Sequence, residues 1–191
     1  TSEFLAIFDD DDISQPDRLS KQYNRIVDYE REFSTDMVLC HSARIQNFDH
    51  DFSRYEKTVG TRAGIALHGE DMARRILIGD LGRHGVNIVG SCANCSRMGR
   101  LEVFKKLQGY DENFRRSEDT EFAIRFALAG GHFVGIEEPL VHQKMTIGQE
   151  KKLDQELKYD HQYLVKHKEY LQKIGWYDFS IEWLDMKYAG L

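Results

Sequence analysis

The chain alternates between short apolar runs and longer amphipathic stretches, a pattern typical of an α/β fold. Residues 4–8 form a continuous apolar run that ends in four acids, which predicts a strand buried on both faces of a mostly parallel sheet. Ser14 and Pro16 are helix-start signals. Apolar residues then recur at helical spacing at Leu19, Tyr23, Ile26 and Val27. The beginning of the chain is therefore predicted to be a βα unit.

Further strands and helices follow in alternation. Strand character occurs at residues 36–45, from Val86, and at residues 132–138, which Pro139 closes. Helices are expected over residues 69–78, 101–107 and 118–129, the last with Ser117 as its cap. Residues 48–61 are polar and irregular, which predicts a loop. Together these segments predict a mixed sheet flanked by helices.

The C-terminal part has a different pattern. Residues 149–174 are strongly charged and predict an amphipathic helix. Its apolar stripe consists of Leu153, Leu157, His161, Leu164, Leu171 and Ile174. Aromatic residues are frequent from Tyr159 to the end, and docking on the body, on a partner chain or on a membrane surface would each suit them. We favour docking on the body, and divide the chain into residues 1–147 and a helical aromatic tail, 148–191.

Composition narrows the classes of protein. Hydrophobic residues make up 41% of the 191 residues, which suits a folded domain rather than a disordered chain. The formal net charge of −6 argues against nucleic acid as the main partner, because phosphate binding needs a basic surface. No apolar run approaches the roughly 20 residues of a membrane span.

The 3 cysteines are too few and odd in number for a disulfide framework, which predicts a reducing, cytoplasmic setting. Cys92 and Cys95 have the spacing of a redox or zinc pair. They follow a β-type stretch, however, and residues three apart on a strand point to opposite faces. We therefore interpret them as small structural residues in a strand.

Three groups of residues could carry chemistry. The four aspartates at 9–12 follow the first strand, where α/β folds place ligands, and a divalent cation would relieve their repulsion. Oxygen ligands favour Mg²⁺ or Mn²⁺, although a solvated acidic turn has the same composition. Glu118 and Asp119 open a predicted helix, whose dipole keeps a carboxylate ionised and able to accept a proton. His142 follows a strand. Taken singly, acids in a first helical turn and a lone histidine are ordinary features.

The order of these groups is more specific. The segment Phe-Leu-Ala-Ile-Phe-Asp-Asp-Asp-Asp-Ile at 4–13, followed by Pro16-Asp17-Arg18-Leu19, resembles the D-x-D segment of family-2 glycosyltransferases, which have the GT-A fold. The stretch from Arg100 is similar to the acceptor half of the same family. Its matching parts are residues 103–107, 109–114 and 117–122, with Arg125 and Gly130 beyond them. The resemblance covers about residues 3–147.

The resemblance implies roles for individual residues. Asp9, Asp10 and Asp11 would bind the nucleotide of the donor, with Asp11 as a metal ligand and Asp9 nearer the ribose. Asp119 would be the catalytic base, with Glu118 beside it, and His142 would lie near the metal and the diphosphate. The implied reaction is inverting transfer of a sugar from a nucleotide diphosphate, UDP for example, to a hydroxyl group. The implied cofactor is Mn²⁺ or Mg²⁺.

The implied setting is surface-polysaccharide or lipopolysaccharide synthesis, with a saccharide or lipid-linked acceptor at the inner face of the cytoplasmic membrane. The family carries a nucleotide-binding half before its D-x-D strand, whereas this chain begins at that strand. We therefore expect an acceptor-side portion of a partial GT-A (Rossmann-like) fold with an uncovered sheet edge, which a second copy could cover to form a homodimer. The fragment itself could be inactive.

Two alternatives remain. One is a non-catalytic module that binds a sugar or partner through a degenerate transferase fold. The other is a haloacid-dehalogenase-type phosphatase, which also begins with an apolar strand and D-x-D. That family needs Thr or Val two places after the second Asp, where this chain has Ile13.

Overall fold

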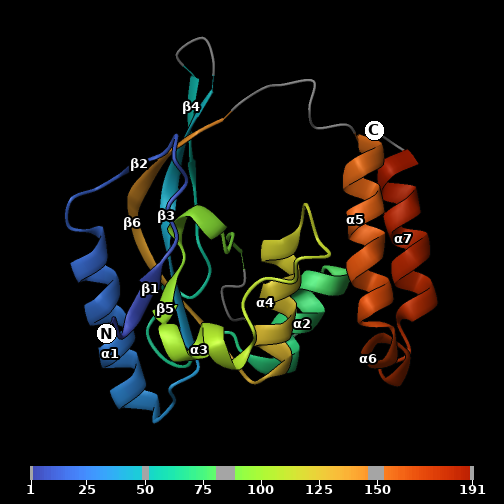
Figure 1. Ribbon diagram of the computed structural model, residues 1–191, viewed down its shortest axis with the longest axis horizontal. Helices are drawn as coiled ribbons and strands as arrows, with labels where there is room; N and C mark the ends of the chain where they lie inside the picture. Colours follow the sequence, from blue (N-terminus) through green and yellow to red (C-terminus); the bar gives the residue numbers. More distant parts are fainter. Residues whose placement is uncertain (1, 49–51, 81–88, 146–152, 190–191) are drawn as a thin grey trace.

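The computed structural model describes residues 2–48, 52–80, 89–145 and 153–189 and has a mixed α/β architecture (Figure 1). Its strands are β1 (Phe4–Ala6), β2 (Ile13–Ser14), β3 (Val38–Phe48), β4 (Phe52–Glu56), β5 (Met98–Arg100) and β6 (His132–Lys144). Its helices are α1 (Arg18–Phe33), α2 (Gly69–Ile78), α3 (Leu101–Lys106), α4 (Glu118–Leu128), α5 (Leu153–Lys166), α6 (Lys168–Lys173) and α7 (Tyr177–Ala189), with a 3₁₀ turn, η1 (Asn94–Ser96). The predicted mixed sheet flanked by helices is confirmed.

The strands are arranged in the order β1-β5-β3-β6-β2, and β4 pairs with the far part of β3. Of these pairings, β3 with β6 is parallel and the others are antiparallel. The first strand ends the order and is only partly buried. The prediction that it is buried on both faces of a mostly parallel sheet is therefore wrong. Its apolar residues pack, partly buried, on opposite faces: Leu5 joins the core cluster that includes α3, and Phe4 and Ala6 join the cluster that includes α1.

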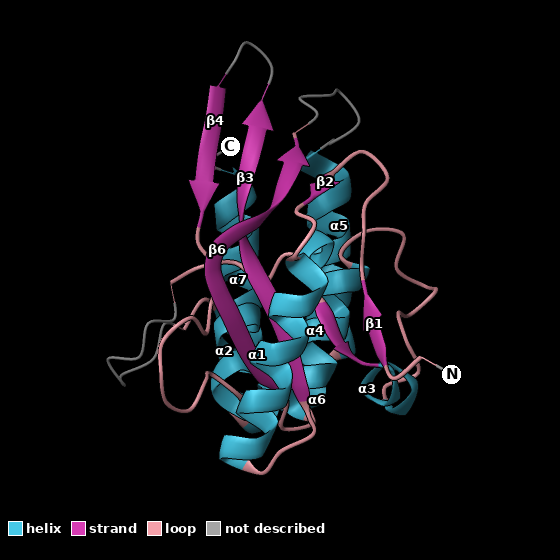
Figure 2. Ribbon diagram, turned by 90° about the vertical axis from the view of Figure 1, so that its left-hand side faces the viewer, coloured by secondary structure: helices cyan, strands magenta, loops and turns pink. Residues whose placement is uncertain are grey.

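Helices cover both faces of the sheet. Side chains alternate along β3, so Val38 and Cys40 pack with α1 while Leu39 packs with α2, α3 and α4 on the opposite face. Figure 2 shows α1 crossing in front of β3 and β6. The central strands are thus buried on both faces.

The buried face of α1 differs from the predicted one. Leu19 and Tyr23 are each 45% exposed. The buried residues are Arg18, Gln22, Ile26 and Tyr29. Arg18 and Gln22 can be buried although they are polar, because they make hydrogen bonds to backbone carbonyls in and beside the strands. The Arg18 guanidinium donates to the carbonyl of Ile7 at 2.8 Å, for example.

Several sequence-predicted boundaries also change. The expected loop at 48–61 contains β4, which forms a hairpin with β3 that projects beyond the helices (Figure 2). The last strand does not end at Pro139, because a register shift opposite Ala43 accommodates the proline inside β6. The expected strand from Val86 falls largely outside the described residues. The chain at Cys92 is irregular and Cys95 lies in η1, so the interpretation of the cysteines as strand residues is wrong.

The C-terminal helices form a further layer against α2 and α4 (Figure 1). Leu164, Leu171 and Leu184 bury their side chains against Leu77 of α2 and Ile124 of α4. This confirms that the tail docks on the body. The predicted single helix ends at Lys166, and α6 and α7 follow it. Within the described ranges, no helix is both long and apolar enough to cross a bilayer.

Candidate active site

The acidic segment after β1 forms a tight turn. The backbone N–H of Asp12 donates to the carbonyl of Asp9 at 3.3 Å, and the Asp12 carboxylate accepts the backbone N–H of Lys144 at 2.9 Å. Ile13 then pairs with His142 of β6. The turn is therefore held against the end of β6, and the N–H of Lys144 orients the Asp12 carboxylate.

Asp119 occupies the first turn of α4. Its carboxylate accepts the backbone N–H of Thr120 at 2.8 Å, which satisfies one of the free N–H groups of the helix start. Ser117 is the N-cap residue of α4, as predicted, but its φ is +58° and its hydroxyl makes no capping hydrogen bond. Its hydroxyl instead donates to Asp160 of α5 at 3.3 Å.

The two acidic motifs meet at one cavity. A cavity of about 670 Å³ is lined by Asp9 from the acidic turn, by Glu118 and Asp119 from α4, and by Arg115 and Asn94 among others. The pKa of Asp9 is raised by burial, and then by the charges of Asp12, Asp11 and Asp119. Glu118 and Asp119 thus line one cavity with Asp9, whereas Asp10 and Asp11 do not line it.

Asp9, Asp12 and Cys95 can hold a metal ion. One potential ligand atom of each lies within 4.8 Å of the others. The second carboxylate oxygen of Asp12 is buried without a hydrogen-bond partner among the described residues, as expected of a ligand without its ion. The residues present therefore fit a divalent cation, and a cation would also offset the repulsion that raises the pKa of Asp9.

The sequence-predicted metal ligands are placed differently. Asp11 is exposed and His142 belongs to β6, and neither joins a group of three potential ligands in the described part of the chain. Cys95 adds no negative charge to the site as a neutral thiol, which is favoured because burial raises its pKa to about 11. The two carboxylates are the stronger ligands for Mg²⁺ or Mn²⁺.

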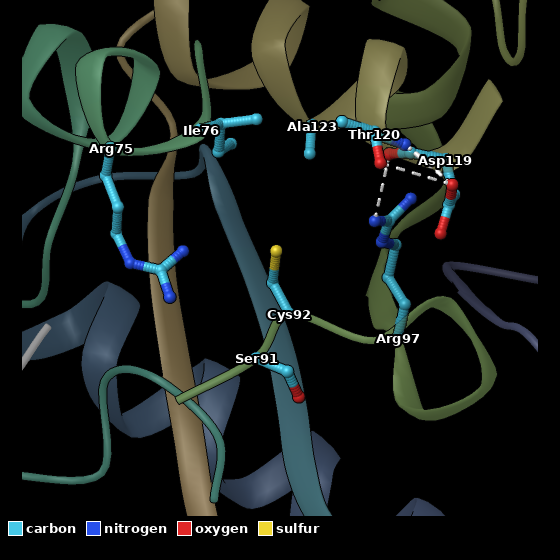
Figure 3. A pocket seen from close by; sticks show the side chains of 8 residues that line it. All are labelled: Arg75, Ile76, Ser91, Cys92, Arg97, Asp119, Thr120 and Ala123. Carbon is cyan, nitrogen blue, oxygen red and sulfur yellow. Dashed lines mark hydrogen bonds between the residues drawn. The ribbon is translucent and has the colours of Figure 1, made fainter. Parts of the chain in front are cut away.

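A second cavity, of about 370 Å³, also has Asp119 in its wall (Figure 3). Arg75 of α2 and Arg97 point into it from either side of Cys92. The base of α4, Thr120 and Ala123, completes the wall. Asp119 therefore lines both cavities.

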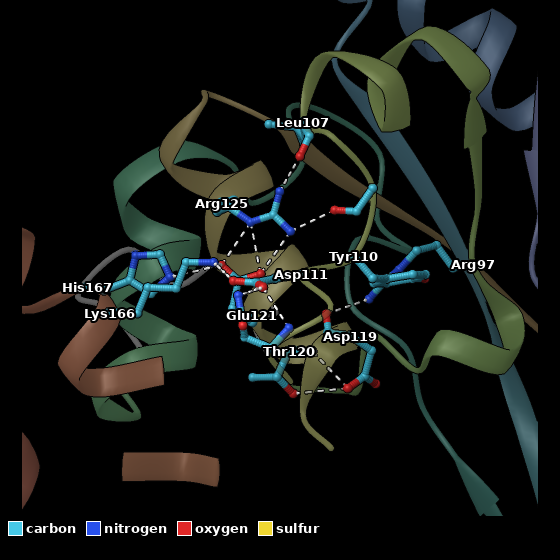
Figure 4. A network of polar contacts seen from close by, with 12 residues as sticks. Arg97, Leu107, Tyr110, Asp111, Asp119, Thr120, Glu121, Arg125, Lys166 and His167 are labelled. Carbon is cyan, nitrogen blue, oxygen red and sulfur yellow. Dashed lines mark hydrogen bonds and ion pairs between the residues drawn. The ribbon is translucent and has the colours of Figure 1, made fainter. Parts of the chain in front are cut away.

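A network of charges joins the first turns of α4 to neighbouring segments (Figure 4). Glu121 is completely buried and forms ion pairs with Arg125 at 2.8 Å and with Lys166 of α5 at 2.6 Å. Burial raises the pKa of this carboxyl group, but its contacts with His167, Arg125 and Lys166 outweigh burial and lower the pKa to about 2. Glu121 is thus a charged residue that joins the helix carrying Asp119 to the C-terminal layer.

No protein-family model matches the chain, and no curated protein matches it in sequence.

Sequence reasoning missed three residues of the site. Asp12 belongs to the same acidic run as the predicted ligands, and the sequence could not show which way its side chain points. Cys95 lies after an irregular segment whose path is set by tertiary contacts. Arg97 carried no sequence signal, because an isolated arginine is usually exposed.

Proposed function

We propose that this protein is a metal-dependent inverting glycosyltransferase. The observation that supports this most strongly is the shared cavity of Asp9 and Asp119, which joins an acidic turn suited to a cation and diphosphate with a carboxylate suited to a general base. The motifs that resemble family-2 glycosyltransferases supply these same two residues. A partial GT-A fold is consistent with the mixed sheet.

The residues have distinct roles in the proposed reaction. Asp9 and Asp12 would hold Mn²⁺ or Mg²⁺, which when bound neutralises charge on the leaving diphosphate. Asp119 accepts the proton of the acceptor hydroxyl as that oxygen attacks the anomeric carbon. Because the base acts on the face opposite the leaving group, the anomeric configuration inverts. Arg115 adds positive charge to the cavity that contains Asp9, where the donor would bind.

The proposed donor is a nucleotide-diphosphate sugar, with UDP as the first nucleotide to test. The proposed acceptor is a saccharide or lipid-linked saccharide of a surface polysaccharide, glycosylated at the cytoplasmic face of the membrane. The aromatic residues Trp176, Phe179 and Trp183, each at least 40% exposed, lie at helical spacing near and along α7 and suit contact with such a membrane or acceptor.

The test measures donor binding and turnover in the full-length protein. UDP should raise the melting temperature in the presence of Mn²⁺ and not in the presence of EDTA. Incubation with a UDP-sugar should release UDP, and the Asp9→Asn variant should lose both responses. Stabilisation by UDP without turnover of any sugar would favour the non-catalytic binding module, and no response of either kind would contradict the proposal.

A further inference from the structure

The smaller cavity, which shares Asp119 with the first, is a candidate second substrate site. Asp119 and Thr120 line it, and Asp119 also lines the cavity that contains Asp9. A general base must reach the proton of the acceptor while the donor lies on the opposite side of the reacting oxygen. A residue that lines both cavities, as Asp119 does, can meet this requirement.

The size of the second cavity limits its ligand. Its volume of about 370 Å³ is near the lower end of the roughly 300–1,000 Å³ found for small-molecule sites. It therefore suits one sugar ring with its substituents rather than an extended chain. Ser91 and Thr120 add hydroxyl groups to the wall, and Ile76 and Ala123 add apolar surface.

The charge of the second cavity is mostly positive. Arg75 and Arg97 both line it, whereas Asp119 is the single acid among its lining residues. The two guanidinium groups enter from opposite walls, as Figure 3 shows. Arginine recognises carboxylates and phosphates through paired hydrogen bonds, so two such groups in a small cavity favour an anionic substituent.

Arg97 gives the stronger argument, because it is a buried charge surrounded by neutral partners. Its side chain is 1% exposed, and its nitrogens lie 3.3 Å from His41 Nε2, from the Tyr110 hydroxyl and from the backbone carbonyl of Asp119. His41 is uncharged, since burial and then Arg97 itself hold the pKa of its imidazole well below its usual range.

The positive charge of the Arg97 guanidinium is only partly balanced by its surroundings. The face of Phe122 lies 5.4 Å from its guanidinium, which offsets part of the desolvation. Among the described residues, no carboxylate lies within 4.0 Å of this guanidinium. A buried cation without a full counter-ion is costly, and an anionic ligand would supply the missing charge.

We infer that this cavity is the acceptor subsite and that it selects an acceptor sugar carrying an anionic group, a carboxylate or a phosphate, beside the hydroxyl that is glycosylated. The assignment of the bound sugar as the acceptor rests on the proposed function. The binding of an anionic sugar in this cavity does not depend on it. Arg75 and Arg97 are the specificity-determining residues, and Asp119 takes the proton of the acceptor hydroxyl.

The test measures binding of three acceptor analogues in the absence of donor. The probes are methyl β-glucuronide, glucose 6-phosphate and the neutral methyl β-glucoside, each titrated against the full-length protein by NMR. One of the anionic probes should bind about tenfold or more tightly than the neutral one. The tighter of the two identifies the anion as carboxylate or phosphate. Equal binding of all three, or binding of none, would overturn the inference.

Variants separate this role from a structural one. Arg75→Gln should remove the preference for the anionic probe while methyl β-glucoside still binds. Because the Arg75 guanidinium also donates to the backbone carbonyl of Gly90, the melting temperature of this variant is measured beside its binding. Cys92→Ser, which alters the same cavity without changing its charge, is the matched control and should keep the preference. Arg97→Lys should keep part of the preference that Arg97→Gln loses. A preference that survives Arg75→Gln would contradict the assignment.

The result is independent of donor chemistry. If UDP-sugar turnover is found but no anionic preference, the acceptor inference alone fails. If the anionic preference is found without any response to UDP and Mn²⁺, the subsite stands and the proposed transferase reaction fails.

Discussion

The ammonium group of Lys166 in α5 lies 2.6 Å from the carboxylate of Glu121 in α4, although the Glu121 side chain is wholly inaccessible to solvent. Arg125, on the next turn of α4, pairs with the same carboxylate and also donates to the carbonyl of Gly109 at 2.7 Å. Glu121 therefore connects three segments that are distant in sequence. One of these segments, α4, carries the proposed catalytic base in its first turn.

Glu121→Gln should destabilise the protein by roughly 3 kcal/mol, because it leaves two cations facing a neutral amide in a buried site. Chemical denaturation monitored by circular dichroism measures this change. Glu102→Gln is the matched control, since the exposed pair of Glu102 with Lys105 contributes at most about 1 kcal/mol. Equal effects of the two substitutions would contradict the importance of the buried network.

Stability should fall in acid as Glu121 becomes protonated. The pKa of Glu121 is about 2 in the folded protein and near its ordinary value of 4.5 in the unfolded chain. The stabilisation is therefore complete above about pH 4.5 and decreases as the pH falls from 4.5 toward 2. Melting temperatures across this range should fall less steeply for Glu121→Gln than for the unchanged protein. Parallel curves would show that the residue titrates normally.

A separate pH effect is expected from His132. Burial, and then the stacked ring of His68, lower the pKa of His132 to about 4. The neutral imidazole is thus favoured by folding, and its contribution is complete above pH 6.5 and decreases as the pH falls from 6.5 to 4. His132→Asn offers an amide oxygen to the Tyr29 hydroxyl, which lies 2.8 Å from Nδ1, and should flatten the melting temperature in this window. Histidine NMR titration checks the pKa directly.

Asp119→Asn should lower the rate of sugar transfer by about 100-fold or more and leave donor affinity intact. The amide oxygen can still accept the N–H of Thr120, so the helix start should be preserved. Transfer assays and UDP titration in the presence of Mn²⁺ measure the two effects. Lost donor affinity with unchanged turnover would refute the assignment of Asp119 as the base.

Replacement of single aspartates should identify the cation ligands. Asp12→Asn is expected to weaken Mn²⁺ binding by about tenfold or more, since the unpartnered oxygen of Asp12 faces Asp9 and Cys95. Asp10→Asn, in the same turn but outside the cavity, is the matched control. Electron paramagnetic resonance of free Mn²⁺ measures the affinity. A larger effect from Asp11→Asn than from Asp12→Asn would favour the ligand implied by the sequence motif.

The sequence was sufficient where local chemistry determines structure. The acidic residues 9–12 follow an apolar run, and the helix over Gly69–Ile78 has the predicted bounds, because an apolar stripe and Gly79 beyond it define a helix locally. The two motifs around Asp9 and Asp119 likewise identified the residues that share a cavity.

Tertiary contacts determined what local patterns could not. The buried face of α1 is partly polar because Gln22 donates to the carbonyls of Cys40 and Ser96, and such long-range acceptors leave no trace in periodicity. Asp12, and not Asp11, lies close to Asp9 and Cys95, and the N–H of Lys144 orients its carboxylate. The sequence by itself thus determined which residues carry charge and where helices form. Only the tertiary structure decided which of those charges are buried together, because burial and pairing depend on neighbours brought close by the fold.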